Sequence, residues 1–359
     1  MTGRPRARAF GITNRVNVAI AAAVFIVLYA LLIAVSPIAG SSFLINNFVV
    51  LATPLALAAV GTSLVLIIGG FDLSVAGTIS LSNVIAATAM AAHPGAEWSI
   101  VILVLALGAA VGFVNGIFVA VLGLPSLGVT LSTNIVLAGF ALVILPAPGG
   151  SVPDDFVELL TGTVGPLPVA GLVLVVVAAL WILFAKTRTG MSVFAIGGDP
   201  SASRLSGIPI RRVQVVTYAL AGLCYSAAGL YFSALTATGS PTAGSSFLLS
   251  AFAAAALGLV SFRGGSGSAI AAIFGAATLT VIPKFLFAGG LADFWVGAFQ
   301  GLVILLALCI PWVSRRLNAL RRSRTTDPVE PTPIGPTPAA VDDLGGIGST
   351  PRTRTEQHV

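Results

Sequence analysis

The sequence predicts an all-α, polytopic transmembrane helical bundle of about ten spans, with both termini in the cytoplasm. The chain is 57% hydrophobic and only 8% charged, whereas a soluble domain is about one quarter charged. Its apolar residues form runs of about 20, the length that crosses a hydrocarbon core about 30 Å thick. Its basic residues gather in a few segments between or beside these runs, which is typical of cytoplasmic loops and tails.

The spans follow in order from a basic N-terminus. Four arginines precede the first apolar run, which is too long for the core of a signal peptide and lacks a convincing small-residue cleavage site, so it is expected to remain as a span. The ten expected spans are 18–36, 48–68, 75–92, 99–122, 127–145, 167–185, 213–235, 247–262, 268–288 and 294–313.

The charges agree with this topology. With the N-terminus inside, every Lys and Arg of the 18 except Lys284 falls in a cytoplasmic segment. The predicted outer loops hold acidic residues, and the longest of them, 146–166, carries Asp154, Asp155 and Glu158. Removing one span would place a basic cluster outside, which is costly, so an even number of spans is favoured.

The chain divides into three parts. Residues 1–17 form a basic cytoplasmic N-terminus and residues 18–313 form the transmembrane domain, which contains a basic cytoplasmic loop at 186–212. Residues 314–359 are rich in Pro, Thr, Gly and Asp and hold few large apolar residues, so this cytoplasmic tail is predicted to be disordered.

The loop at 186–212 contains the signals of a short helix. Asp199 is a suitable N-cap, Pro200 fits the first helical position, and Gly207 supplies a left-handed stop. Such a short helix is unstable alone and needs a surface to hold it. One interpretation is an ordinary connector; the other is a docking element in which Arg204 meets an acidic partner and Leu205 offers an apolar contact.

Two glycine-rich inner turns invite comparison. Residues 69–74 read GGFDLS, with Gly69 and Gly70 permitting a chain reversal, and a second pair stands at 264–265, which hints at an internal duplication. Asp72 is most simply an N-cap for the third span. An acid near the depth of the bilayer also marks transport pathways or coupling contacts, so Asp72 and its neighbour Ser74 are candidates for that role.

Few polar side chains interrupt the spans. Such amides usually join helices by hydrogen bonds worth about 1 kcal/mol, and the alternative is that they line a hydrated path for a solute. The candidates for path lining are Asn83, Asn115, Asn134 and Gln300, with Ser132 and Thr133 beside them.

Several other functions are disfavoured. The GxxxxGK[ST] phosphate-binding loop is absent. The GxSG run containing Ser266 lacks a histidine base in the membrane region, since His93 falls in an outer loop and His358 in the tail. The two cysteines lie in apolar runs, and no ligand cluster predicts a metal site or a cofactor. Orientation explains the basic residues better than binding to nucleic acid does.

Several segments resemble the ribose-type permeases of ABC transporters. These are 195–199 (AIGGD) with Ala202 and 204–208 (RLSGI), the inner turn GGFDLS, and Asn115-Gly116 followed by 123–125 (GLP). Two positions depart from that family: Ser250 stands where it commonly has Asp, and 259–261 read LVS where it has Gly-Thr-Ser.

The resemblance implies the permease subunit of an ATP-driven importer of a monosaccharide or similar polar solute in the bacterial inner membrane. It implies that ATP is hydrolysed by separate ATPase subunits, which press on a coupling site formed by Asp199, Arg204, Leu205 and Gly207. It also implies a second permease copy or homologue and an extracytoplasmic solute-binding protein. The alternative is an ion-coupled secondary carrier, which would need acids inside the spans that the sequence lacks.

Overall fold

The computed structural model describes residues 5–290 together with 295, 298, 301–302 and 305. Within this part, eight helices are long and apolar enough to cross a membrane. They are α1 (Pro5–Val35), α2 (Ser42–Ile67), α3 (Val75–Ala92), α4 (Glu97–Gly116), α5 (Ser126–Ile144), α7 (Val169–Lys186), α10 (Ile210–Thr236) and α12 (Ala269–Ala288).

Shorter elements connect these helices. They are η1 (Pro37–Gly40), the π-helical turn η2 (Ile117–Val121), α6 (Asp154–Thr161), α8 (Arg188–Gly198), α9 (Pro200–Leu205), η3 (Ala243–Ser246) and α11 (Phe247–Leu257). The strands β1 (Thr163–Val164) and β2 (Leu167–Pro168) form a small antiparallel hairpin that pairs Thr163 with Pro168.

Eight of the ten expected spans coincide with long helices, which confirms a helical, multi-pass membrane protein. The span expected at 247–262 is wrong in length. Its helix α11 has 11 residues, so it extends about 16 Å and cannot cross the hydrocarbon core alone. It ends because Gly258 is followed by Leu259 in the left-handed conformation, with φ 56°. The span expected at 294–313 lies largely outside the described residues.

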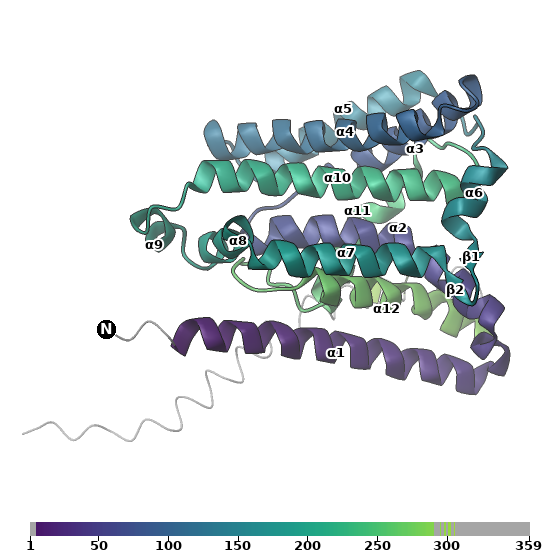
Figure 1. Cartoon of the computed structure of the whole chain (residues 1–359), viewed down its shortest axis with the longest axis horizontal. Coiled ribbons are helices and arrows are strands. Elements are labelled where there is room, and N and C mark those ends of the chain that lie inside the picture. The colour runs from purple at the N-terminus through teal and green to yellow at the C-terminus, as the bar shows by residue number, and fades with distance from the viewer. Residues whose placement is uncertain (1–4, 291–294, 296–297, 299–300, 303–304, 306–359) are drawn as a thin grey trace, which may run out of the picture. The chain divides into compact units, whose positions relative to one another are not determined.

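The helices pack as an antiparallel bundle around α2 and α10 (Figure 1). In that view α4 and α5 lie on one side of α10, and α2, α7, α12 and α1 lie on the other. The closest packing joins α4 to α10, where Gly108, Gly112 and Gly116 recur every fourth residue. A Cβ atom on Gly112 would collide with the backbone of Tyr218, so these glycines bring the two helices into backbone contact.

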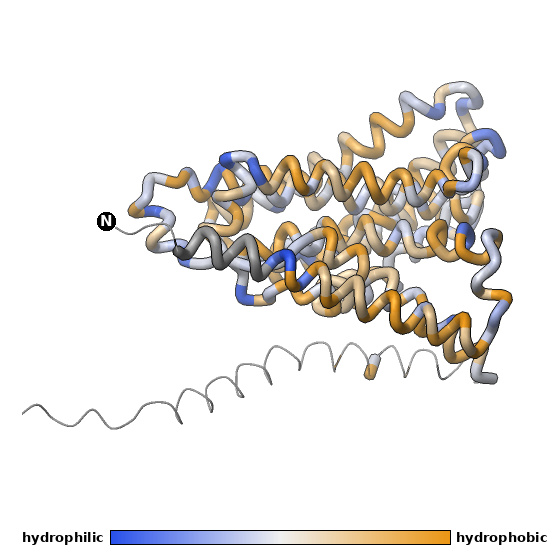
Figure 2. Tube along the Cα trace, turned by 60° about the horizontal axis from the view of Figure 1, so that its bottom comes forward, coloured by the Kyte–Doolittle hydropathy of each residue, from blue (hydrophilic) through white to orange (hydrophobic). Residues whose placement is uncertain are grey.

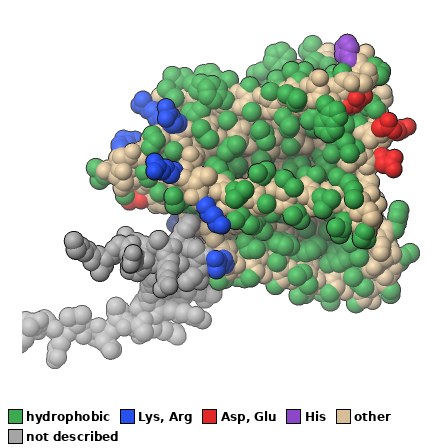
Figure 3. All heavy atoms as spheres, in the orientation of Figure 1, with side chains coloured by type: hydrophobic (Ala, Val, Ile, Leu, Met, Phe, Trp, Pro, Cys, Tyr) green, Lys and Arg blue, Asp and Glu red, His purple; other side chains and the backbone are tan. Residues whose placement is uncertain are grey.

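The two ends of the bundle differ in charge. Apolar residues cover the lengths of the helices, and hydrophilic residues gather where the helices end (Figure 2). Basic side chains lie at the end that carries α8 and α9, whereas most of the acidic side chains visible in the described part lie at the opposite end (Figure 3). This is the separation that the positive-inside rule expects if α8 and α9 face the cytoplasm. Lys284 is the exception and lies within α12.

Candidate functional site

The short helix α9 begins and ends as its sequence predicts. The Oδ1 atom of Asp199 accepts hydrogen bonds from the N–H groups of Ser201 and Ala202, each at 2.9 Å. At the other end the Gly207 N–H donates to the Arg204 carbonyl and the Ile208 N–H donates to the Ser203 carbonyl. Gly207 has φ 74°, the left-handed conformation that this closing motif requires.

The outer surface of α9 has no apolar cover from the described chain. The Leu205 side chain is 91% exposed, and Arg204 is also exposed. Covering the Leu205 side chain with apolar surface would contribute about 1.5–3 kcal/mol of favourable free energy. Ser203, by contrast, is 4% exposed and faces the body of the protein. The helix therefore presents an apolar side chain next to a guanidinium at the basic end of the bundle.

The sequence interpretation missed α8, the helix just before α9. Thr187 caps it, since its Oγ1 atom accepts the Gly190 N–H at 3.0 Å. Its buried side is formed by Val193 and Ile196, which lie in one apolar cluster with Ile67 and Val260. The spacing of three between Val193 and Ile196 is the signal that could have identified this helix. The docking segment therefore consists of two helices, of which α8 is anchored and α9 is exposed.

Asp72 does not cap α3, so the N-cap interpretation is wrong. The helix begins after Ser74, and the Asp72 Oδ1 atom accepts both the Ser74 N–H at 3.0 Å and the Ser74 hydroxyl at 2.5 Å. The carboxylate is 1% exposed, and its Oδ2 atom has no hydrogen-bond partner among the described residues. Burial raises the pKa of Asp72 to about 6, while the two bonds from Ser74 act in the opposite direction.

Hydrogen bonds connect this buried acid to two neighbouring helices. The Ser74 hydroxyl, which donates to Asp72, accepts from the Asn115 amide of α4 at 3.0 Å. The Asn115 Oδ1 atom in turn accepts from the Thr133 hydroxyl of α5 at 2.6 Å. The chain of bonds therefore runs from the inner turn through α4 to α5, and Asn115 is fully buried within it.

One side of α5 supports the same turn. Three of its side chains accept backbone N–H groups that the turn and the first turn of α3 leave without helical partners. The pairs are Phe71 N–H to Ser126 (3.3 Å), Leu73 N–H to Thr130 (2.9 Å) and Gly77 N–H to Asn134 Oδ1 (2.6 Å). The start of α3 is therefore capped by a different helix, a tertiary arrangement that no local motif predicts.

Of the other residues predicted to line a path, Asn83 lies in a buried hydrogen-bonded position. Asn83 is fully buried; its amide donates to the Thr238 carbonyl at 3.3 Å and its Oδ1 atom accepts the Ser240 N–H at 2.6 Å. It thereby holds the non-helical segment before α11 against α3. Asn115 and Asn134 thus join helices by hydrogen bonds, which is one of the two interpretations, whereas Asn83 joins α3 to a non-helical segment. Gln300 lies outside the described residues.

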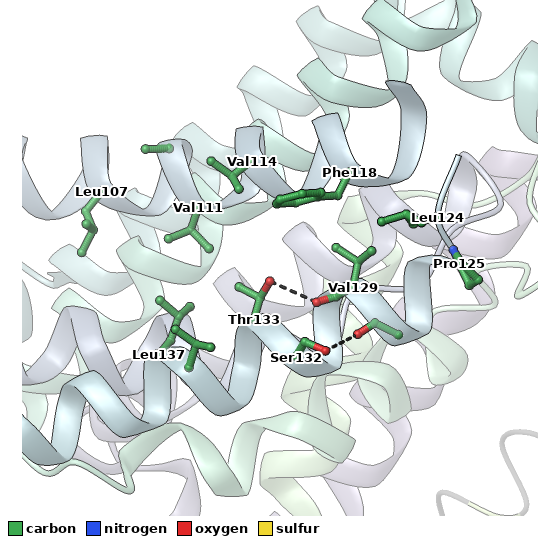
Figure 4. Close-up of a pocket in the computed structure, with 13 residues that line it drawn as sticks. Leu107, Val111, Val114, Phe118, Leu124, Pro125, Val129, Ser132, Thr133 and Leu137 are labelled. Carbon is green, nitrogen blue, oxygen red and sulfur yellow. Dashed lines mark hydrogen bonds between the residues drawn. The ribbon is translucent and has the colours of Figure 1, made fainter. Parts of the chain in front are cut away.

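A groove of about 670 Å³ opens between α4 and α5 (Figure 4). Its walls are apolar, with Val111, Val114 and Phe118 on the α4 side. The only hydroxyl groups in the described lining belong to Ser132 and Thr133. The Thr133 end of the hydrogen-bond chain therefore reaches the wall of this groove.

The candidate site contains no metal-binding arrangement. Among the residues that the structure describes, no three His, Cys, Asp or Glu side chains lie together as metal ligands would.

The chain is similar to known transport proteins along most of its length. A family profile described as the permease component of the branched-chain amino acid transport system matches residues 44–308. A probable ABC transporter permease protein of Sinorhizobium fredii is 35% identical over 75% of this chain and 81% of its own. No solved structure matches the chain significantly.

Two further relatives carry names that state a solute. The ribose import permease protein of Escherichia coli is 33% identical over 79% of this chain and 91% of its own. The galactose/methyl galactoside import permease protein of Haemophilus influenzae is 31% identical over 80% of this chain and 91% of its own. The resemblance seen in the sequence is thereby confirmed and the carrier alternative is not supported: the chain belongs to the permease component family of the branched-chain amino acid transport system and is a permease subunit of an ABC importer.

Proposed function

We propose that this chain moves a monosaccharide or a similar small polar solute into a bacterial cell across the inner membrane. The relatives named for ribose and galactose import support this class of solute. Two ATPase subunits would sit below the end that carries α8 and α9, and a second permease copy or homologue would complete the path. ATP hydrolysis then belongs to the ATPase subunits.

The observation that carries this proposal is the exposed helix α9 at the basic end of the bundle. Asp199 and Gly207 cap both ends, which gives the helix defined boundaries in spite of its six residues. Leu205 is 91% exposed, and burying it in an apolar pocket of the ATPase would be favourable. Arg204 would add a charge-assisted contact with an acidic residue of that pocket.

A solute-binding protein would deliver the solute at the opposite end. There α6 exposes Asp154, Asp155 and Glu158, while Phe156 is buried and anchors the helix. Fixed acidic groups on an anchored helix suit a partner with a basic rim, because complementary charge directs association and sets register.

The polar candidates for path lining take a supporting role in this proposal. Asn115 and Asn134 use their amides to hold the chain around the start of α3, and Asn83 does so at the middle of this helix. We infer that they position the walls of the path and that Asp72 and Ser74 fix the inner turn between α2 and α3.

The docking role is tested by Leu205→Ser. Because Leu205 contacts little of its own chain, the variant should reach the membrane at the wild-type level, yet the ATPase should no longer co-purify and ATP-dependent uptake should fall. Leu167→Ser is the matched control, since Leu167 is an exposed leucine of β2 at the opposite end and lies outside α6. Wild-type ATPase association and uptake in Leu205→Ser would contradict docking through α9.

The solute is tested separately. Vesicles are prepared with the permease in the membrane, the ATPase on the side that carries α9 and the solute-binding protein on the opposite side. They should accumulate radiolabelled ribose or galactose only when ATP is present on the side that carries α9. Uptake driven by an ion gradient without the ATPase would contradict the proposal and support the carrier.

A further inference from the structure

Three pairs of adjacent glycines from distant parts of the chain meet at the cytoplasmic end of the bundle. The first pair follows α2, the second ends α8, and the third lies in the turn before α12. These pairs are Gly69-Gly70, Gly197-Gly198 and Gly264-Gly265. In Figure 1, α8 lies beside the end of α2, and Figure 3 shows basic side chains at this end of the bundle.

Gly197 is the centre of the contact. A Cβ atom at this position would collide with the carbonyl oxygen of Ile67, the last residue of α2, and would lie 2.5 Å from the Gly265 nitrogen. The same Ile67 oxygen accepts the Gly265 N–H at 2.8 Å. The end of α2, the end of α8 and the turn before α12 therefore share one point, and their backbones touch without side chains between them.

The contact is equally tight from the third segment. A Cβ atom on Gly264 would lie 2.7 Å from the Gly197 oxygen, and one on Gly265 would lie 2.8 Å from the Gly198 Cα atom. Both glycines also have positive φ angles, 85° and 77°, which other residues rarely adopt. The turn is therefore shaped to bring its backbone against α8.

Each of the two turns at this contact is attached to further helices. The first turn is bonded to α5 and, through Asp72 and Ser74, to Asn115 of α4. The second turn is bonded to α1: the Gly267 N–H donates to Asn14 Oδ1 at 3.3 Å, and the Asn17 amide donates to the Leu259 carbonyl at 3.2 Å. A movement of α8 at Gly197 would therefore reach α4 and α5 through the first turn and α1 through the second.

Backbone contact is suited to carrying displacement. A flexible side chain between two segments can absorb a small shift by changing its rotamer, whereas a close-packed backbone contact cannot and transmits the shift. On the same helix, Val193 and Ile196 seat α8 in the apolar cluster that contains Ile67 and Val260. The helix is thus held firmly on the bundle while α9 stays exposed.

We propose that Gly197 is a positioning residue that couples α8 to the two glycine turns, so that force applied at α9 moves the ends of α2, α3 and α12 together. The proposal rests on the docking role of α9 argued above. It predicts that a side chain at Gly197 separates α8 from both turns and weakens the coupling between ATP hydrolysis and transport, while docking of the ATPase persists.

The test compares Gly197→Ala with Gly198→Ala. Gly198 is the matched control, because it lies one residue further in the same helix and a Cβ atom there would meet nothing within 4 Å. Both variants are reconstituted with the ATPase and the solute-binding protein, and ATPase co-purification, ATP hydrolysis and solute uptake are measured. For Gly197→Ala the uptake per ATP hydrolysed should fall roughly 2- to 30-fold, the range in which coupling mutations act. Gly198→Ala should match the wild type.

The outcomes separate this proposal from the docking role. If Gly197→Ala binds the ATPase and transports like the wild type, the transmission proposal is wrong and docking through α9 still stands. If Leu205→Ser leaves ATPase binding intact, the docking role fails whatever Gly197→Ala does. If Gly197→Ala does not reach the membrane, Gly265→Ala opens the same contact from the other side. Loss of both variants from the membrane would show that the contact serves folding alone and would overturn the proposal.

Discussion

Replacing Asn134 by leucine should loosen the start of α3. Asn134 Oδ1 accepts the Gly77 N–H at 2.6 Å, and Gly77 is buried. The two helices are so close here that a Cβ atom added to Gly77 would lie 2.7 Å from the Asn134 carbonyl oxygen. Leucine keeps a similar bulk, so it excludes water but offers no acceptor. The Gly77 N–H would then be buried without a partner, which costs about 1–3 kcal/mol.

Amide hydrogen exchange of the first turn of α3 measures this cost locally. A loss of about 1–3 kcal/mol corresponds to exchange that is roughly 5- to 150-fold faster at Gly77. Asn134→Asp retains an acceptor at the same position and should restore slow exchange. Ser132→Ala is the control, because the Ser132 hydroxyl is exposed and bonds the Gly128 carbonyl of its own helix. If Asn134→Leu exchanges as slowly as Ser132→Ala, the capping of α3 by α5 is refuted.

Three further predictions concern orientation, strain and charge. Reporter fusions after Gly95 and Pro153 should report the outside and a fusion after Arg188 the cytoplasm; a cytoplasmic signal at Pro153 would contradict the topology. Leu259→Gly should stabilise the protein by about 1 kcal/mol in thermal unfolding in detergent, since it relieves a left-handed leucine; a lower stability would contradict strain at φ 56°. In the folded protein the pKa of Asp72 is raised from 3.8 to about 6, so the folded state binds this proton more tightly than the unfolded state does. The free energy of unfolding should therefore fall by about 3 kcal/mol as the pH rises between these two values, and stay level above them. Asp72→Asn should remove this slope, and equal slopes in both proteins would contradict the burial of the ionised group.

The structure changes the meaning of several residues that were recognisable in the sequence. Asp72 looked like a cap for the helix that follows it. Instead, the Asp72 Oδ1 atom accepts both of its hydrogen bonds from Ser74, which precedes that helix. Asn134 looked like a polar residue of a path, but its oxygen caps the helix that Asp72 was expected to cap. Both differences have one cause: the acceptor nearest in space to the α3 amides belongs to a segment 57 residues away.

Leu259 and Gly197 show how residue identity and tertiary contact combine. Leu259 adopts φ 56° where the resembled family has glycine, so α11 still ends at this point although the residue is unfavourable there. Gly197 and Gly198 are indistinguishable as a sequence pair. Only the fold places Ile67 and Gly265 against the first and leaves open space beside the second.

The sequence by itself determined the class of the protein, the positions of eight membrane-length helices, the boundaries of α9 and the family. These follow from hydropathy, capping residues and motifs, which act within a few residues or along one helix. The tertiary structure alone decided that α11 is too short to span, that α5 caps α3, and that Gly197 packs against both Ile67 and Gly265. Those features depend on which backbones approach each other in space, and the segments that meet at Gly197 lie more than 60 residues apart along the chain, beyond the reach of any local pattern.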